Sequence, residues 1–176
     1  MTVSTPNDSR RITLAELAEY SYSVNLALMT LGLGERFTLQ ELIVAVQEHY
    51  GCKVKLVPFS DMPLPHTATA FVVPGVYIVI FYRDDVPASH AQQLICHEFV
   101  HVLCNHQSYE CQELAAKLVA ELAMYVPDGY QAAACRVCSR ADFDNPQEIE
   151  AECGGTYLAS KLIYADDAFT TFLLDL

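Results

Sequence analysis

The amino-acid sequence predicts an α+β fold in a single domain, with a small β-sheet between helical segments of the chain. Runs of β-branched and aromatic residues lie in the middle, at residues 53–82, whereas helix-start signals precede and follow them. A length of 176 residues, 52% of them hydrophobic, suits one domain with a sizeable core. We expect residues 1–10 to be flexible because they are polar, and residues 11–176 to form the domain.

Two helices are predicted before the sheet. A threonine followed three residues later by a glutamate is the pattern of a capping box, in which each residue accepts a hydrogen bond from the backbone N–H of the other. The pattern occurs at residues 13–16 and 38–41. The first helix is expected to continue to about residue 30, and the second to end at Gly51.

The strands are predicted from three short runs. Residues 53–58 alternate Val and Leu with Lys, which indicates a strand with one face in water. A proline-rich loop follows. Residues 70–73 and 76–82 are rich in β-branched and aromatic side chains, and Pro74 and Gly75 separate them. This arrangement predicts a β-hairpin.

A helix is predicted soon after the hairpin. The chain turns at residues 84–87, and Ser89 is followed three residues later by Gln92. We therefore expect Ser89 to cap a helix that runs to about Cys104. A further helix is expected over residues 109–125.

The last predicted helix covers residues 147–164. Asn145 is a preferred N-cap residue, and Pro146 suits the first helical position because its missing N–H would have no partner there. Gly154 and Gly155 are small enough to let this helix approach another one closely.

The helix after the hairpin carries the sequence His-Glu-Phe-Val-His at residues 97–101. Because His97 and His101 are four residues apart, their side chains share one helix face and can bind one Zn²⁺. Glu98 points to a different side, where it can take a proton from a metal-bound water. A strand beside this helix would offer an extended peptide an edge to pair with. The motif therefore predicts a zinc hydrolase of the metallopeptidase type.

A catalytic zinc site needs three protein ligands and an open position for water. Glu148 is our first choice for the third ligand, because it opens a helix rich in acidic and small residues. A glutamate there also stabilises the helix dipole, and that role stays open as well. Glu113 and Glu121 are the alternative ligands. His106 follows His101 by five residues, so we expect it to point off the ligand face and to end the helix.

The seven cysteines are an odd number in a chain without a secretion signal, which indicates reduced thiols that are mostly part of the core. Cys135 and Cys138 form a Cys-x-x-Cys pair. One such pair is half of a structural zinc site, and Cys111 and Cys153 are the residues that would have to complete it. The other interpretation is a loop with two free thiols.

The charge and hydropathy patterns exclude several partners. The chain contains 22 Asp and Glu against 10 Lys and Arg, a formal charge of −12, so it lacks the basic surface of a nucleic-acid-binding protein. No apolar run reaches the length that spans a bilayer, and the N-terminus does not resemble a signal peptide. We therefore expect a cytoplasmic protein without a membrane partner.

Together these features resemble the ImmA/IrrE-type metallopeptidases over about residues 38–164. The likeness comprises a helix ending in glycine, a valine-rich strand, a hairpin strand and the His-Glu-Phe-Val-His segment with Asn-His shortly after it. That family completes its zinc site with a later helix of the form Glu-x-x-Ala-Asn/Asp-x-Phe-Ala. Residues 148–151 match its first half, but Gly-Gly replaces Phe-Ala. Residues 113–116 are a second partial match, and residues 120–124 are similar to the ending that the first one lacks.

The resemblance implies a zincin-like domain and a cytoplasmic zinc endopeptidase whose substrate is a protein, in that family often a transcriptional repressor. His97 and His101 match the family's zinc ligands, and Glu98 matches its general base. The third ligand is not decided by the resemblance. The alternative function is a non-catalytic, zinc-containing module of the same fold that binds a protein partner. Neither the identity of the substrate nor the oligomeric state follows from the sequence.

Overall fold

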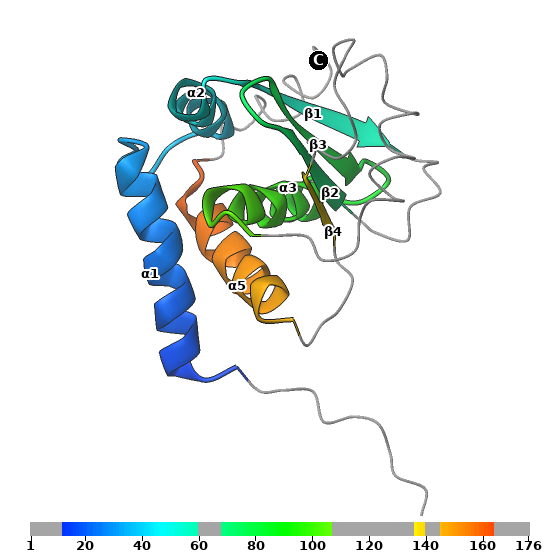
Figure 1. Ribbon diagram of the computed structural model, residues 1–176. Coiled ribbons are helices and arrows are strands. Elements are labelled where there is room, and N and C mark those ends of the chain that lie inside the picture. Colours follow the sequence, from blue (N-terminus) through cyan, green and yellow to red (C-terminus); the bar gives the residue numbers. More distant parts are fainter. Residues whose placement is uncertain (1–11, 60–67, 107–135, 140–144, 164–176) are drawn as a thin grey trace, which may run out of the picture.

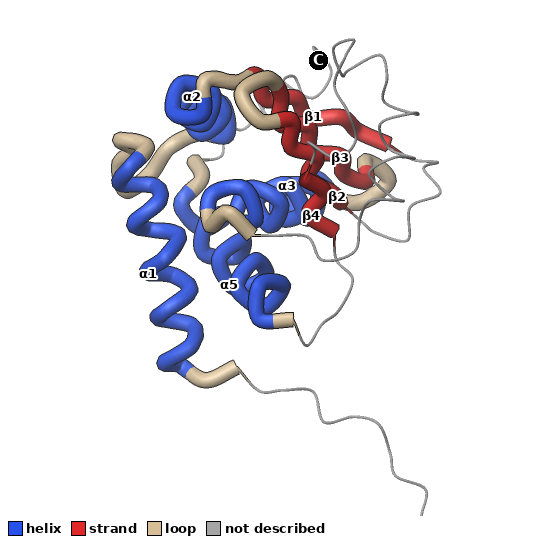
Figure 2. The backbone as a smooth tube through the Cα atoms, viewed as in Figure 1, coloured by secondary structure: helices blue, strands red, loops and turns tan. Residues whose placement is uncertain are grey.

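The computed structural model describes residues 12–59, 68–106, 136–139 and 145–163. Within these ranges the chain forms four helices and four strands, which confirms the α+β class (Figures 1 and 2). The helix expected at residues 109–125 lies outside them. The elements are α1 (Leu14–Thr30), α2 (Leu39–Tyr50), β1 (Lys53–Phe59), β2 (Ala68–Val73), β3 (Tyr77–Arg83), α3 (Ala88–Leu103), β4 (Arg136–Ser139) and α5 (Pro146–Lys161).

The strands form one sheet in the order β1-β3-β2-β4. β1 pairs with β3 in parallel, and β2 is antiparallel to both β3 and β4. The expected hairpin joins β2 to β3. At its turn Gly75 has a φ of 70°, which glycine adopts at low cost, and the N–H of Val76 donates to the carbonyl of Val73 at 3.0 Å. β2 therefore lies inside the sheet, with β4 along its outer side.

Three of the described helices, α3, α5 and α1, follow one another outward from one side of the sheet, whereas α2 lies beside β1 (Figure 1). α3 contacts β2 and β3, α5 packs against α3, and α1 packs against α5. α3 thus lies between the sheet and another helix, and residues 94–102 are all buried. Among the described residues, no helix has both the length and the apolar character needed to cross a bilayer.

The burial of α3 stabilises the fold through its apolar residues but also removes ionisable side chains from water. Its core-facing apolar residues, such as Ile95 and Phe99, each contribute about 1.5–3 kcal/mol of stability when they are fully buried. His97, Glu98 and His101 are buried beside them. A buried ionisable side chain destabilises the fold unless it is paired or binds a metal. The fold therefore requires partners for these three side chains.

Three of the expected helix starts are confirmed. Thr13 and Thr38 both form complete capping boxes, and the Asn145 side chain accepts a hydrogen bond from Gln147 N–H at 2.9 Å. Gly51 ends α2 with a φ of 61°, in the left-handed region.

The predicted cap of α3 is wrong. α3 begins at Ala88, and Pro87 is its N-cap without any side-chain hydrogen bond. The carbonyl of Pro87 accepts hydrogen bonds from the N–H groups of His90 and Ala91 at 2.8 and 3.0 Å. Because the proline ring fixes the backbone at the end of the preceding turn, the helix starts before Ser89, which lies within its first turn.

α5 ends three residues earlier than predicted, at Lys161. Leu162 is extended and forms a parallel bridge with Phe37. The Phe37 N–H donates to the carbonyl of Lys161 at 3.3 Å, and the Ile163 N–H donates to the carbonyl of Phe37 at 2.8 Å. Pairing with a distant backbone segment thus replaces the last helical turn, which local sequence signals do not predict.

The expected close approach at the two glycines of α5 is present. A Cβ atom on Gly155 would lie 2.9 Å from the Cα and 3.0 Å from the backbone nitrogen of His97. A Cβ atom on Gly154 would lie 2.7 Å from a methyl group of Val24 in α1 and 3.1 Å from Val100. α5 is therefore in contact with the backbone of the helix that carries the histidines, at the position of His97 itself.

We expect Gly155→Ala to destabilise the protein by about 1–3 kcal/mol, because the backbone of a buried helix cannot move aside as a side-chain tip can. Urea unfolding of the two proteins measures this difference. Gly34→Ala is the control, since a Cβ atom there would meet nothing within 4 Å, and it should change the free energy of unfolding by at most about 0.5 kcal/mol. Equal stability of Gly155→Ala and wild type would contradict the close packing.

Candidate metal centre

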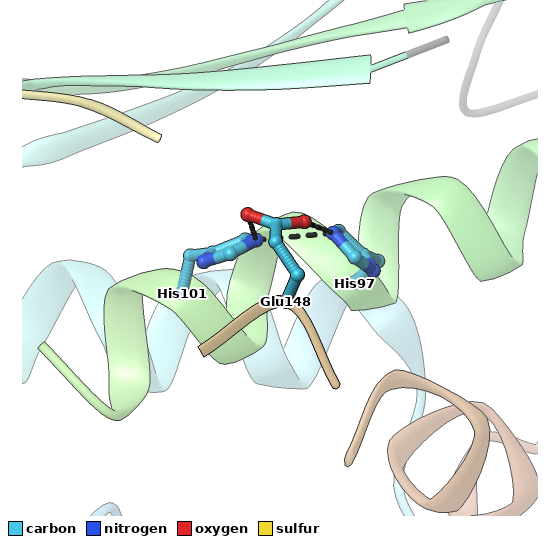
Figure 3. A group of neighbouring side chains, drawn as sticks. All are labelled: His97, His101 and Glu148. Carbon is cyan, nitrogen blue, oxygen red and sulfur yellow. Dashed lines mark hydrogen bonds and ion pairs between the residues drawn. The ribbon is translucent and has the colours of Figure 1, made fainter. Parts of the chain in front are cut away.

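Two helices bring three buried ionisable residues together, His97 and His101 from α3 and Glu148 from the first turn of α5 (Figure 3). We call these residues the first site. The ligand atoms that they offer all lie within 4.8 Å of one another, and each residue is at most 7% exposed. The Glu148 carboxylate points at the ring nitrogens of both histidines. The group could hold a metal ion.

The distances within the first site fit a small tetrahedral ion. The two Nε2 atoms are 3.0 Å apart. One carboxylate oxygen of Glu148 lies 3.5 Å from Nε2 of His97, and the other lies 3.5 Å from Nε2 of His101. Donors about 2.0–2.1 Å from one tetrahedral zinc ion are separated by roughly 3.3–3.4 Å. The three donor groups therefore already have nearly the separations that such an ion imposes.

Glu148 gives a second sign that a cation fits here. Its Oε2 atom is buried and accepts no hydrogen bond from any described residue, although it lies 3.5 Å from Nε2 of His97. Leaving a buried carboxylate oxygen without a donor costs about 1–3 kcal/mol or more. A metal ion between the carboxylate and the two imidazoles would supply the missing partner.

His97 has an additional carboxylate on its other nitrogen. Its Nδ1 lies 3.4 Å from Oε2 of Glu152, one turn after Glu148 on α5. Burial by itself lowers the pKa of His97, but the carboxylates of Glu148, Glu152 and Glu98 outweigh it and raise the pKa to about 9. In a metal complex through Nε2, the Nδ1–H group would face Glu152, an arrangement that fixes the orientation of histidine ligands.

His101 is supported in a different way. Its Nδ1 lies 3.0 Å from Nδ1 of His106, and Nε2 of His106 lies 3.2 Å from a carboxylate oxygen of Glu150. Burial lowers the pKa of His101 to about 2, and the neighbouring His97 and His106 add to this effect. His101 is thus held neutral, which is the form that binds metal.

The expectation for His106 was incomplete. It lies beyond the end of α3, outside the first site, but it does not point away from it. Asn105 has a φ of 54°, which turns the chain back, and the His106 N–H donates to the carbonyl of His101 at 2.9 Å. The ring is therefore buried behind His101. Helical spacing could not show this contact, because the helix has already ended.

Glu98, the expected general base, is 1% exposed. Its Oε2 accepts a hydrogen bond from the backbone N–H of Ala70 in β2 at 2.7 Å. Glu98 and His97 both line a pocket of about 310 Å³, together with Ala68, Glu152 and residues from the first half of α3. The side chain is thus fixed to the sheet at the wall of a cavity that also reaches the first site.

A second group of donor atoms lies behind the first. Cys104, His106 and Glu150 place one sulfur, one nitrogen and one oxygen within 4.8 Å of one another and could hold a metal ion. We call them the second site. Burial raises the pKa of the Cys104 thiol to about 12, and Glu150 adds to the shift. Sequence reasoning missed this group, although Cys104 and His106 directly follow the histidine motif.

The remaining site predictions fall largely outside the described residues. This applies to Glu113 and Glu121, the alternative ligands, and to Cys111 and Cys135. Cys138 is a residue of β4, and its side chain is not among those described. The described cysteines are free, and all but Cys104 are buried, as expected for thiols of the core: Cys52, Cys96, Cys104 and Cys153.

No family model, curated protein or solved structure matches this chain.

The zinc content of the wild type and of variants tests which residues bind metal in the first site. We expect about one zinc per chain to survive dialysis in the wild type, and His101→Ala or Glu148→Gln to reduce the affinity by more than the roughly 10–100-fold effect of an outer hydrogen-bond partner. Mass spectrometry of metal content gives the result. His90→Ala is the matched control, because His90 is an exposed histidine of the same helix. Full zinc retention by His101→Ala would show that the first site is not the ligand set.

Zinc binding should also release a proton. With a pKa of about 9, His97 carries a proton at pH 7 before metal binds, whereas His101, with a pKa of about 2, does not. The ion must displace that single proton, so the affinity should rise about tenfold per pH unit below pH 9. Calorimetric titration of chelator-treated protein in buffers of different ionisation enthalpy counts the protons. An affinity independent of pH between 6 and 8 would contradict the assignment.

Proposed function

We propose that the protein is a zinc-dependent metallo-endopeptidase. The observation that carries this proposal is the first site, where two imidazoles and one carboxylate converge. Oε2 of Glu148 accepts no hydrogen bond there from a described residue. Two nitrogens and one oxygen are a donor set of catalytic zinc, which keeps a further position for water. The resemblance of the sequence to ImmA/IrrE-type peptidases points to the same chemistry.

In this proposal His97, His101 and Glu148 hold the ion, and Glu152 and His106 hold the two imidazoles in orientation. Zinc bound there would polarise the scissile carbonyl and lower the pKa of a water molecule. Glu98 would accept a proton and donate it to the leaving amine. The Ala70 N–H keeps one oxygen of Glu98 in place during both transfers.

The substrate we propose is an extended segment of a protein, such as a repressor-type regulator. The sheet limits how such a segment can bind. The outer side of β2 is already paired with β4 at Thr69–Val72, so an added strand cannot use the edge of β2 there. Ala68, which precedes this pairing, lines the pocket with His97 and Glu98. Among the described residues, this end of β2 is where a peptide backbone could approach both the sheet and the first site.

The Gly-Gly pair that departs from the family pattern is compatible with this function. Gly155 is in contact with the backbone of His97, and Glu148 lies two turns earlier on the same helix. A phenylalanine or alanine at that position would push α5 away from α3. We therefore infer that the glycines serve to bring Glu148 within reach of the two histidines.

Glu98→Gln tests the catalytic assignment. We expect this variant to bind zinc as the wild type does and to cleave about 10²–10⁴-fold more slowly, because the amide cannot accept the proton. The measurement uses a fluorogenic peptide library with zinc-loaded protein, and Gln93→Ala is the comparison, since it changes a polar side chain at the wall of the same pocket without removing the base or a group that contacts a histidine of the first site. Cleavage by Glu98→Gln at the wild-type rate would refute the mechanism.

The burial of Glu98 favours a second function, a zinc-containing module that binds a protein without cleaving it. A carboxylate that is 1% exposed and bonded to a strand N–H can also be a structural link between α3 and the sheet. In that case the zinc-loaded wild type would cleave no peptide of the library, and Glu98→Gln, whose amide oxygen can still accept from the Ala70 N–H, would bind zinc as the wild type does. Turnover by the wild type thus separates the two functions.

A further inference from the structure

The second site faces a different part of the molecule from the first. Cys104 and Glu150 line a pocket of about 390 Å³ formed mainly by α1 and the end of α2, including Tyr22 and His49. The pocket at His97 and Glu98 shares no lining residue with it. An ion could therefore reach the second site without passing the first.

The donor set of the second site suits a borderline or soft cation. Cys104 follows α3, His106 follows the left-handed turn at Asn105, and Glu150 comes from α5. A thiolate, an imidazole and a carboxylate together select zinc or a similar transition-metal ion over magnesium or calcium, which prefer oxygen alone. Without an ion, the Glu150 carboxylate lies 3.2 Å from Nε2 of His106.

The two sites are connected by the 3.0 Å contact between Nδ1 of His101 and Nδ1 of His106. An ion bound to Nε2 of His101 leaves the ring proton on Nδ1, pointing at His106. Nδ1 of His106 can accept this hydrogen bond only if the ring proton of His106 is on Nε2, facing Glu150, 3.2 Å away. Each tautomer is thus set by the partner of the other nitrogen.

A metal ion at the second site requires the opposite tautomer of His106. When Nε2 of His106 binds metal, its ring proton must be on Nδ1, where it faces the Nδ1–H of His101. Two donors then oppose each other in a buried contact, which is unfavourable. We propose that Cys104, His106 and Glu150 bind a second divalent metal ion, and that its binding weakens metal binding at the first site.

The coupling rests on the proposed function, because it requires His101 to bind a metal ion at the first site. The second site itself does not depend on that function. Because coupling between two binding sites is reciprocal, an ion at the first site must weaken the second by the same factor. A second ion would then raise the concentration of free metal at which the first site is half-saturated.

Cobalt(II) distinguishes the sites by absorbance, since only the second site contains a thiolate and gives a sulfur-to-metal charge-transfer band. Titration of the full-length wild type with cobalt should show this band after the first equivalent. Cys104→Ser should lose it, although serine keeps a hydroxyl that can donate to Glu150. Cys52→Ser is the control, because Cys52 is a buried thiol that belongs to neither site. An identical charge-transfer band in Cys104→Ser and wild type would overturn the second site.

Glu148→Gln tests the coupling in the same titration. Loss of the first site frees His101 to change tautomer, so the Cys104-dependent band should half-saturate at a cobalt concentration about tenfold lower than in the wild type. An unchanged midpoint would overturn the coupling. The first site contains no thiolate, so cobalt bound there absorbs without the charge-transfer band. If this absorption persists in Glu148→Gln, the result counts against the proposed peptidase site and not against the second site.

Discussion

Gly155 of α5 lies so close to α3 that a methyl group at that position would stand 2.9 Å from the Cα of His97. This contact determines how far α5 is from the histidine helix. The three acidic residues earlier on α5 reach His97, His101 and His106 only because the two backbones are this close. In turn, α3 can bury three ionisable side chains between the sheet and α5 because those partners are present. The packing of two helices and the chemistry of the centre are therefore one constraint.

The sequence predicted well those features that depend on neighbours in the chain. The capping boxes, Gly51 and the hairpin all follow from patterns a few residues long. The pair of histidines on one helix face follows from helical periodicity, and Glu148 was the first choice among three glutamates, although Glu113 and Glu121 lie outside the described residues. The failures depend on distant contacts. Pro87 rather than Ser89 begins α3, and Phe37, far away in sequence, decides where α5 ends. The contact of His106 with His101 depends on a left-handed residue after the helix, for which Asn105 was the only signal.

The acidic start of α5 has a different meaning in three dimensions from the one it has in sequence. A row of glutamates at a helix N-terminus is ordinarily explained by the helix dipole. Here the three carboxylates face different ring nitrogens of the histidines. Glu148 faces Nε2 of both ligand histidines, Glu152 faces Nδ1 of His97, and Glu150 faces Nε2 of His106. Alternate residues at the start of the helix thus place one carboxylate where it could bind a metal ion and two where they support the histidines. The second nitrogen of His97 faces Glu152, and that of His101 faces His106.

The position of Glu148 within α5 has a consequence for the time scale on which metal can leave. Glu148 is the third residue of the helix, after an asparagine cap and a proline, whereas the two histidines are in the middle of the most buried helix. First turns of helices open and close far more often than helix centres do. When this turn unwinds, the carboxylate is withdrawn, and an ion bound at the first site would be left on two imidazoles. Exchange of such an ion would need no opening of the core, and a weaker Asn145 cap would shorten its residence time.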